Sequence, residues 1–215
     1  LTAQRDRDFR LRRAIATQPC STSGAQRETV ASLCLATGPA SSALSAVVWG
    51  DSTGESWGPL VQAWAAERQA RAAVFSISGC PPLLGIRSPL HAHCEFADDA
   101  WKERLITELR PSLIVLTARW GAYVNEPPPG YRGLAHRITT SEDDPPTLAS
   151  SRDAIALRLP ATLERLTQIA PVIVVLAPPD LVRNPFAALP RQLEFRPTLE
   201  AHREAQRLVE GVVRK

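Results

Sequence analysis

The chain of 215 residues contains no methionine, few aromatic side chains and only short hydrophobic runs. Without Met, Leu1 is not expected to be a natural start, so we expect a mature chain or a piece of a longer product. No run approaches the ~18 uncharged apolar residues of a membrane-spanning helix, which excludes a span within this stretch. The formal net charge of +3 is small and scattered, and it gives no argument for a nucleic-acid partner.

What remains is the composition of a folded domain. Hydrophobic residues make up 44% of the chain and charged residues 22%, which is typical of globular rather than disordered proteins. The length fits one domain, or one and a half, with a real hydrophobic core.

Four cysteines fall in two pairs with the same spacing, Cys20 with Cys34 and Cys80 with Cys94. Four cysteines allow three pairings, and the sequence does not choose among them. We favour disulfides between neighbours, which would close two short loops and imply an oxidising compartment. The alternative is four buried free thiols in a cytosolic protein. A metal site is the weaker interpretation, because no CxxC motif or histidine cluster accompanies the cysteines.

The order of strands and helices predicts the fold class. Four short apolar runs, rich in β-branched residues, have the pattern of strands buried on both faces: 44–49, 72–77, 113–117 and 171–176. Helical patterns follow them over 59–71, 97–109, 152–169 and 198–213. This alternation predicts a parallel sheet in a three-layer α/β/α sandwich. Ligands of such sheets bind outside the carboxyl ends of the strands.

Two regions lie outside this alternation. Residues 1–42 are polar and basic at the start, which predicts an N-terminal extension or linker that precedes one domain over 43–215. Residues 124–150 are rich in proline and lack periodicity. A loop of that length in a compact domain is usually functional or mobile.

The sharpest local signal is Gly50-Asp51-Ser52, directly after the first predicted strand. A serine at a strand-to-helix turn lies near the positive end of the helix, where backbone N–H groups can receive a developing oxyanion. The alternative is structural, because Asp51, Ser52 and Thr53 are all common residues at the N-terminus of a helix.

Further motifs follow the other strands in order. They are GCPPL at 79–83, TARW at 117–120 and APP at 177–179. Together with Gly50-Asp51-Ser52 they resemble the SGNH hydrolase superfamily. The likeness is greatest to the SGNH domain fused to acyltransferase-3 membrane proteins, which O-acetylate bacterial surface polysaccharides such as O-antigen. The resemblance covers roughly residues 43–180.

The resemblance implies a flavodoxin-like strand order and a role for each matching residue. Ser52 would be the catalytic nucleophile, and its backbone N–H would form an oxyanion hole with that of Gly79. Arg119 would contact the substrate or the oxyanion, and Trp120, with Tyr123, would stack on a sugar. A strand-end ion pair for Arg119 and core packing for the two aromatic rings are the structural alternatives.

The chain also departs from the family pattern. Thr53 stands where this branch usually has histidine, the third block has no GxND, and no DxxH motif supplies the general base and its acid. His202 lies among charges in a predicted helix, and His136 lies in the long loop without positional support. Either the stretch stops before the last strand and its DxxH motif, which we favour, or the domain is degenerate.

We therefore expect a serine-dependent O-acyltransferase, acting on a bacterial surface carbohydrate with acetyl as the expected group. As the resemblance implies, an upstream membrane domain would deliver the acyl donor, placing the chain in the periplasm, tethered to the inner membrane. No metal or cofactor is needed. The alternatives are a secreted SGNH carbohydrate esterase and a non-catalytic glycan-binding domain. The sequence does not specify the sugar, the acylated position or the oligomeric state.

Overall fold

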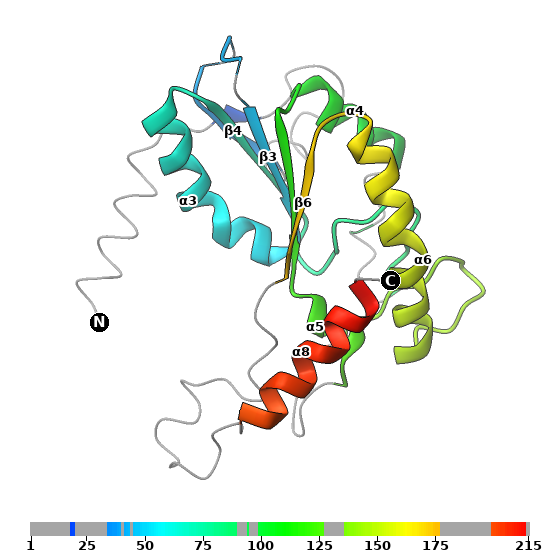
Figure 1. Ribbon diagram of the computed structural model, residues 1–215. Helices are drawn as coiled ribbons and strands as arrows, with labels where there is room; N and C mark the ends of the chain where they lie inside the picture. Colours follow the sequence, from blue (N-terminus) through cyan, green and yellow to red (C-terminus); the bar gives the residue numbers. More distant parts are fainter. Residues whose placement is uncertain are drawn as a thin grey trace.

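The computed structural model describes residues 18–19, 34–39, 41–43, 45–89, 94, 99–126, 136–176 and 199–213. Within these ranges a six-stranded sheet lies between helices on its two faces (Figure 1). The predicted α/β sandwich is therefore confirmed.

Four parallel strands form the centre of the sheet in the order β4-β3-β5-β6. Their bounds are Ser45–Gly50 for β3, Arg71–Ser76 for β4, Leu113–Ala118 for β5 and Val172–Leu176 for β6. They coincide with the four predicted strands, and their order is the flavodoxin-like one. Because all four run in one direction, the loops that follow β3, β4 and β5 leave the sheet at the same edge.

Two antiparallel strands, β1 (Gln18–Pro19) and β2 (Cys34–Thr37), extend the sheet beside β4. Both lie in the range 1–42 that the sequence predicts as an extension. Cys34 and Ala36 are buried in the core. Because β2 has only four residues, too few to establish a periodicity, sequence patterning could not distinguish this strand from a linker.

The helices cover the sheet unequally. Figure 1 shows α3 (Ser52–Arg68) on one face, and α4 (Asp99–Glu108) and α6 (Leu148–Thr167) on the other. The short α5 (Trp120–Val124) follows β5, and α8 (Leu199–Val213) packs against α5 and α6. No helix in the described ranges combines the length and the apolar character that crossing a membrane requires.

Alternation along the strands divides the core between the two faces. Ala72 of β4 packs with Ala65 of α3. On the opposite face Trp49 stacks on Phe75 with ring centroids 5.7 Å apart, and Phe75 meets Trp101 edge-on at 5.6 Å. Leu105, Ile106 and Leu166 close this second layer from α4 and α6. β3, β4 and β5 are largely buried on both sides, which explains why their predicted runs are continuous rather than alternating. The same expectation is wrong for β6, which is only partly buried, with Ile173 50% exposed.

The start of α3 differs from the prediction. The sequence places it at Pro59, where the apolar stripe of the predicted helix begins. In the structure the helix begins at Ser52, and Pro59 lies inside it. Asp51 is the N-cap and accepts a hydrogen bond from the Thr53 N–H. This earlier start places Ser52 at the first helical position.

Candidate functional site

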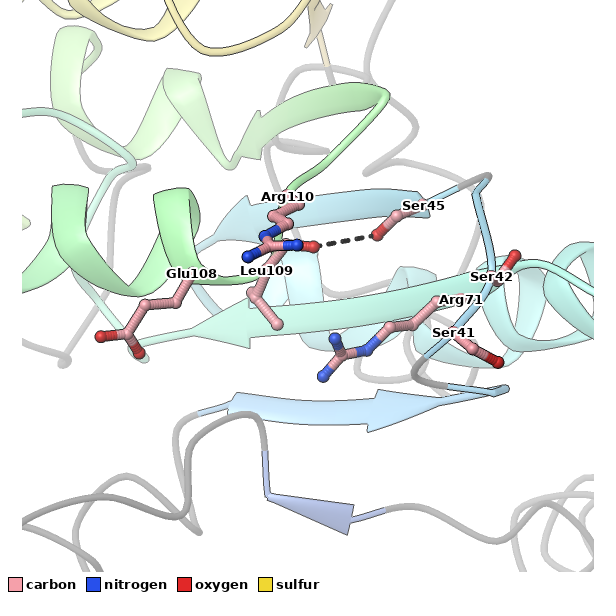
Figure 2. A pocket seen from close by; sticks show the side chains of 7 residues that line it. All are labelled: Ser41, Ser42, Ser45, Arg71, Glu108, Leu109 and Arg110. Atoms are coloured by element: carbon pink, nitrogen blue, oxygen red, sulfur yellow. Dashed lines mark hydrogen bonds between the residues drawn. The ribbon is translucent and has the colours of Figure 1, made fainter.

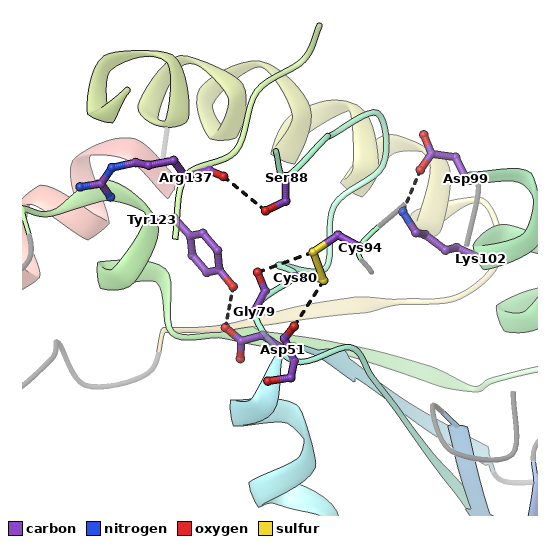
Figure 3. Close-up of a disulfide and its surroundings, with 10 residues drawn as sticks. Asp51, Gly79, Cys80, Ser88, Cys94, Asp99, Lys102, Tyr123 and Arg137 are labelled. Atoms are coloured by element: carbon purple, nitrogen blue, oxygen red, sulfur yellow. Dashed lines mark hydrogen bonds and ion pairs between the residues drawn. A yellow bond between two sulfur atoms is a disulfide. The ribbon is translucent and has the colours of Figure 1, made fainter. Parts of the chain in front are cut away.

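Three segments meet at the carboxyl edge of the sheet, after β3, β4 and β5 (Figure 3). The Ile77 N–H donates to the Gly50 carbonyl oxygen at 3.1 Å, which ties the second segment to the first. The Arg119 N–H donates to Asp51 Oδ2 at 2.9 Å, which ties the third segment to the first. The candidate site is thus held by hydrogen bonds between the segments that follow neighbouring strands, one to a main-chain carbonyl and one to the Asp51 carboxylate.

Ser52 is exposed at the first position of α3. The first N–H groups of a helix have no partner inside it and carry the positive end of its dipole. Asp51 takes the Thr53 N–H, and no group in the described ranges is bonded to the Ser52 N–H or hydroxyl. A hydroxyl and an unused N–H therefore lie together at solvent, as an oxyanion-forming reaction requires.

Gly50 makes this turn possible. A Cβ atom there would lie 2.3 Å from the Thr117 carbonyl oxygen and 2.9 Å from Gly54 Cα. Both neighbours are backbone atoms, so they cannot swing aside as a flexible side chain would. Only glycine lets α3 start this close to β5.

Asp51 connects all three segments. Its carboxylate, on a residue only 2% exposed, accepts hydrogen bonds from the N–H groups of Thr53 and Arg119 and from the Tyr123 hydroxyl. Its carbonyl oxygen accepts from Ser76 Oγ at 2.6 Å. A buried carboxylate with three donors is well satisfied, and bonds to charged acceptors are the stronger kind. Asp51 therefore fixes the backbone on which Ser52 stands.

Tyr123 is the only side-chain partner among the carboxylate's three donors. Its hydroxyl lies 3.0 Å from Asp51 Oδ2, and the residue is 1% exposed. Burial, followed by the negative charge of Asp51, raises the pKa of the Tyr123 hydroxyl well above its usual value. The phenol therefore remains protonated and acts as a donor across the neutral range.

We expect Tyr123→Phe to change the alkaline stability of the domain. The pKa of Tyr123 is raised in the folded protein, so this residue contributes its full stabilisation of the fold below pH 10. The contribution falls as the pH rises above the pKa that the tyrosine has in the unfolded chain. Above about pH 10 the fall amounts to about 1.4 kcal/mol per pH unit. Urea unfolding between pH 8 and 11 should show the variant less stable at pH 8, by about 1–2 kcal/mol, with a shallower alkaline decline. An equally steep fall of stability with pH in the variant and in the unaltered protein would contradict this role.

Gly79 occupies the third position of a turn after β4. The Cys80 N–H donates to the Ile77 carbonyl oxygen at 3.0 Å, and Gly79 has a φ of +74°. A type II turn requires positive φ at this position, which glycine adopts without strain. The turn uses the Cys80 N–H for its own bond. Among the described residues nothing accepts the Gly79 N–H, which leaves this second predicted donor unused.

A disulfide anchors the same turn. Cys80 and Cys94 are bonded, which confirms this neighbour pairing, and Cys94 Sγ lies 3.8 Å from the Gly79 carbonyl oxygen (Figure 3). Cys34 is disulfide-bonded as well, while Cys20 lies outside the described residues. Downstream of the turn, the Leu84 N–H donates to Thr162 Oγ1 of α6 at 3.0 Å. The turn is therefore held from both sides.

Replacing Cys80 and Cys94 together by serine should cost about 3 kcal/mol of unfolding free energy, because the open loop gains freedom in the unfolded chain. Denaturant unfolding of the double variant against the unaltered protein measures the cost. Substitution is preferable to a reductant, which would also reach the Cys34 disulfide. A cost below about 0.5 kcal/mol would show that packing alone holds the turn.

The neighbouring residues Arg119 and Trp120 differ in exposure: the first is exposed and the second is buried. Arg119 is exposed beside the Asp51 turn, and the substrate contact predicted for it stays a prediction. Trp120 is 1% exposed, and its indole N–H donates to the Val175 carbonyl oxygen at 3.0 Å. Trp120 and Tyr123 both lie in the core, so neither ring offers a face to a sugar.

No histidine in the described ranges is bonded to Ser52. The His136 ring lies 5.8 Å from the Tyr123 ring and is only partly buried. His202 belongs to α8, but its side chain lies outside the described part. In the same ranges no group of three or more His, Cys, Asp or Glu could hold a metal ion.

Residues 19–214 match the model of one protein family, the SGNH domain that is found fused to AT3 domains. The chain belongs to this family. No curated protein and no solved structure matches it. SGNH domains of this kind are associated with acyl transfer, and fusion to AT3 domains implies association with a membrane. The match begins within β1, so the SGNH domain includes strands that the sequence assigned to an extension.

Sequence reasoning identified the Ser52 turn but missed the bond between Asp51 and Tyr123. The signal was present in part, since Asp51 follows a strand and Tyr123 lies shortly after another. Their juxtaposition depends on β3 pairing with β5, and a tyrosine three residues after the end of TARW gives no local sign of it.

Proposed function

We propose that this SGNH domain transfers an acyl group, acetyl in the simplest case, to a carbohydrate hydroxyl through an ester on Ser52. The observation that carries the proposal is the exposed hydroxyl of Ser52 at the amino end of α3, beside its own unused N–H. Membership of the SGNH family supports the chemistry.

In the first step Ser52 Oγ would attack the acyl carbonyl carbon. The new bond makes that carbonyl oxygen negative, and the N–H groups of Ser52 and Gly79 would stabilise it. A general base supplied by other residues would take the serine proton and return it to the donor's leaving group. In the second step a sugar hydroxyl would attack the carbonyl carbon of the serine ester and lose its proton to the base. The bond from that carbon to Ser52 Oγ would break, and the base would give the proton to Ser52 Oγ, which leaves the sugar ester and the free serine.

Arg119 is proposed to bind the acceptor or the oxyanion, because its exposed guanidinium follows the strand next to β3. Its five N–H donors suit hydroxyl and carboxylate groups of surface sugars. The acyl donor would come from a membrane domain elsewhere in the protein, and the reaction would take place on the periplasmic side.

The test uses the full-length protein with an activated acetyl ester. Mass spectrometry of the intact protein should find one added acetyl group, and peptide mapping should place it on Ser52. Adding a surface oligosaccharide should then release the acetyl group to sugar faster than to water.

The other outcomes discriminate among the functions. Release to water alone, whatever sugar is added, would indicate an esterase. Complete inertness of the full-length protein, with intact binding of glycan, would indicate a non-catalytic module.

A further inference from the structure

A polar pocket lies at the edge of the sheet opposite Ser52. Its volume is about 340 Å³, within the range of small-molecule sites. Seven residues line it, from the starts of β3 and β4, the segment before β3 and the end of α4 with the two residues after it (Figure 2): Ser41, Ser42, Ser45, Arg71, Glu108, Leu109 and Arg110. We call this hollow the amino-edge pocket.

Strand register explains why these residues meet. Ser45 and Arg71 are direct partners at the first position of β3 and β4, so their side chains share the face that α4 covers. Ser45 Oγ donates to the Leu109 carbonyl oxygen at 3.4 Å, which brings the end of α4 against the strand starts. With six residues in β3, the pocket lies about 20 Å from the turn at Ser52.

The pocket has an excess of positive charge. Two guanidinium groups, those of Arg71 and Arg110, and one carboxylate, that of Glu108, are among its lining groups. Neither guanidinium forms an ion pair with a residue in the described ranges, whereas Arg87 pairs with Glu142 and Arg165 with Glu103. Two uncompensated guanidinium groups beside one hollow attract an anion, and their planar forks match the oxygens of a phosphate.

The backbone of Arg110 adds an independent observation. Its φ is +45°, the left-handed conformation that closes many helices and that glycine adopts most easily. Gln69 closes α3 in the same conformation, and at the end of α4 this turn leaves the Arg110 side chain exposed beside the pocket. Favourable interaction with the end of the α4 dipole is the structural alternative, since it would explain a cation there without any ligand.

We propose that the amino-edge pocket binds the phosphate of a polyol phosphate, such as a glycerol phosphate group. Arg71 and Arg110 bind the phosphate oxygens, and Glu108 accepts hydrogen bonds from the hydroxyl groups of the polyol. The Ser42 and Ser45 hydroxyls already donate to the carbonyl oxygens of Gln69 and Leu109, so they shape the pocket. A single phosphate fits better than a diphosphate, because Glu108 repels a second negative group.

Titration calorimetry with glycerol 3-phosphate tests the proposal, with glycerol and sodium chloride at equal ionic strength as blanks. We expect saturable binding to the unaltered protein, and at least a tenfold loss of affinity in Arg71→Gln and in Arg110→Gly. Arg104→Gln is the matched control, because Arg104 is exposed on the same helix and does not line the pocket. Its affinity should stay within twofold.

Arg110→Gly also separates a binding role from a structural one. Glycine relieves the left-handed strain, so the variant should melt about 2–4 °C higher while it loses affinity. A lower melting temperature with unchanged affinity would show that Arg110 serves the helix end alone. Absence of saturable binding, or equal losses in all three variants, would overturn the proposal.

Vesicles distinguish the two sources of this group. Co-sedimentation with phosphatidylglycerol vesicles, but not with phosphatidylcholine vesicles, and its loss in Arg71→Gln would identify a lipid headgroup. Binding of glycerol 3-phosphate without vesicle binding would identify a soluble phosphate. Neither readout depends on Ser52, so the result is separate from acyl transfer.

Discussion

Ser52→Ala should lower the rate of ester turnover by at least about a thousandfold, because it removes the atom that would carry the acyl group. The side chain is exposed, so the free energy of unfolding should change by no more than about 0.5 kcal/mol. The measurement pairs turnover of a chromogenic acetyl ester by the full-length protein with denaturant unfolding of the same samples.

Ser56→Ala is the matched control for that loss. Ser56 lies one turn further along α3, is exposed, and donates its hydroxyl to the Ser52 carbonyl oxygen. Its removal deletes a serine hydroxyl from the same helix without touching the proposed nucleophile, so activity should stay within about twofold. Equal activity in Ser52→Ala and the unaltered enzyme would end the proposal of a serine ester.

Asp51→Ala should have the largest effect on stability, about 4 kcal/mol of unfolding free energy. The substitution removes the acceptor of three hydrogen bonds and leaves buried donors on Arg119 and Tyr123 without it. Because the bonds converge on one carboxylate, their loss is not a simple sum. Urea unfolding at neutral pH measures the cost, and acyl transfer should fall with it as the Ser52 turn loosens.

Glu55→Ala distinguishes this network from a general effect of charge. Glu55 is an exposed acid in the first turn of the same helix, where it interacts favourably with the dipole. Its loss should cost less than about 1 kcal/mol. If both variants lost the same stability, the helix dipole rather than the hydrogen bonds of Asp51 would explain the effect.

The central sheet was predictable because β3, β4 and β5 are largely buried on both faces. Continuous runs such as 113–116 have no polar residue, and the buried positions of α6, among them Ile155, Leu159 and Leu166, form an apolar stripe. β1 and β2 were not predictable in the same way. They are short, and β2 is a strand because it pairs with the edge of β4. That pairing joins residues far apart in the sequence, so the local composition of β2 does not predict it.

The candidate site shows the same division. Ser52 and Gly79 follow strands directly, so the rule that ligands bind at carboxyl ends was enough to place them at one edge. The buried position of Trp120 and the contact of Tyr123 with Asp51 depend on how α5 turns into the core after β5. The amino-edge pocket brings together residues from 41 to 110, and no motif connects them.

The pairing of β2 with β4 has a consequence for synthesis on the ribosome. β2 emerges after its partner β1, yet its second partner, β4, is made only after β3 and the whole of α3. One edge of the nascent strand must therefore wait unpaired while a long segment is translated, and contacts so distant in sequence form slowly. A nascent chain that ends just before residue 71 should leave β2 accessible to proteases. A chain long enough for residue 76 to have left the ribosome should protect it.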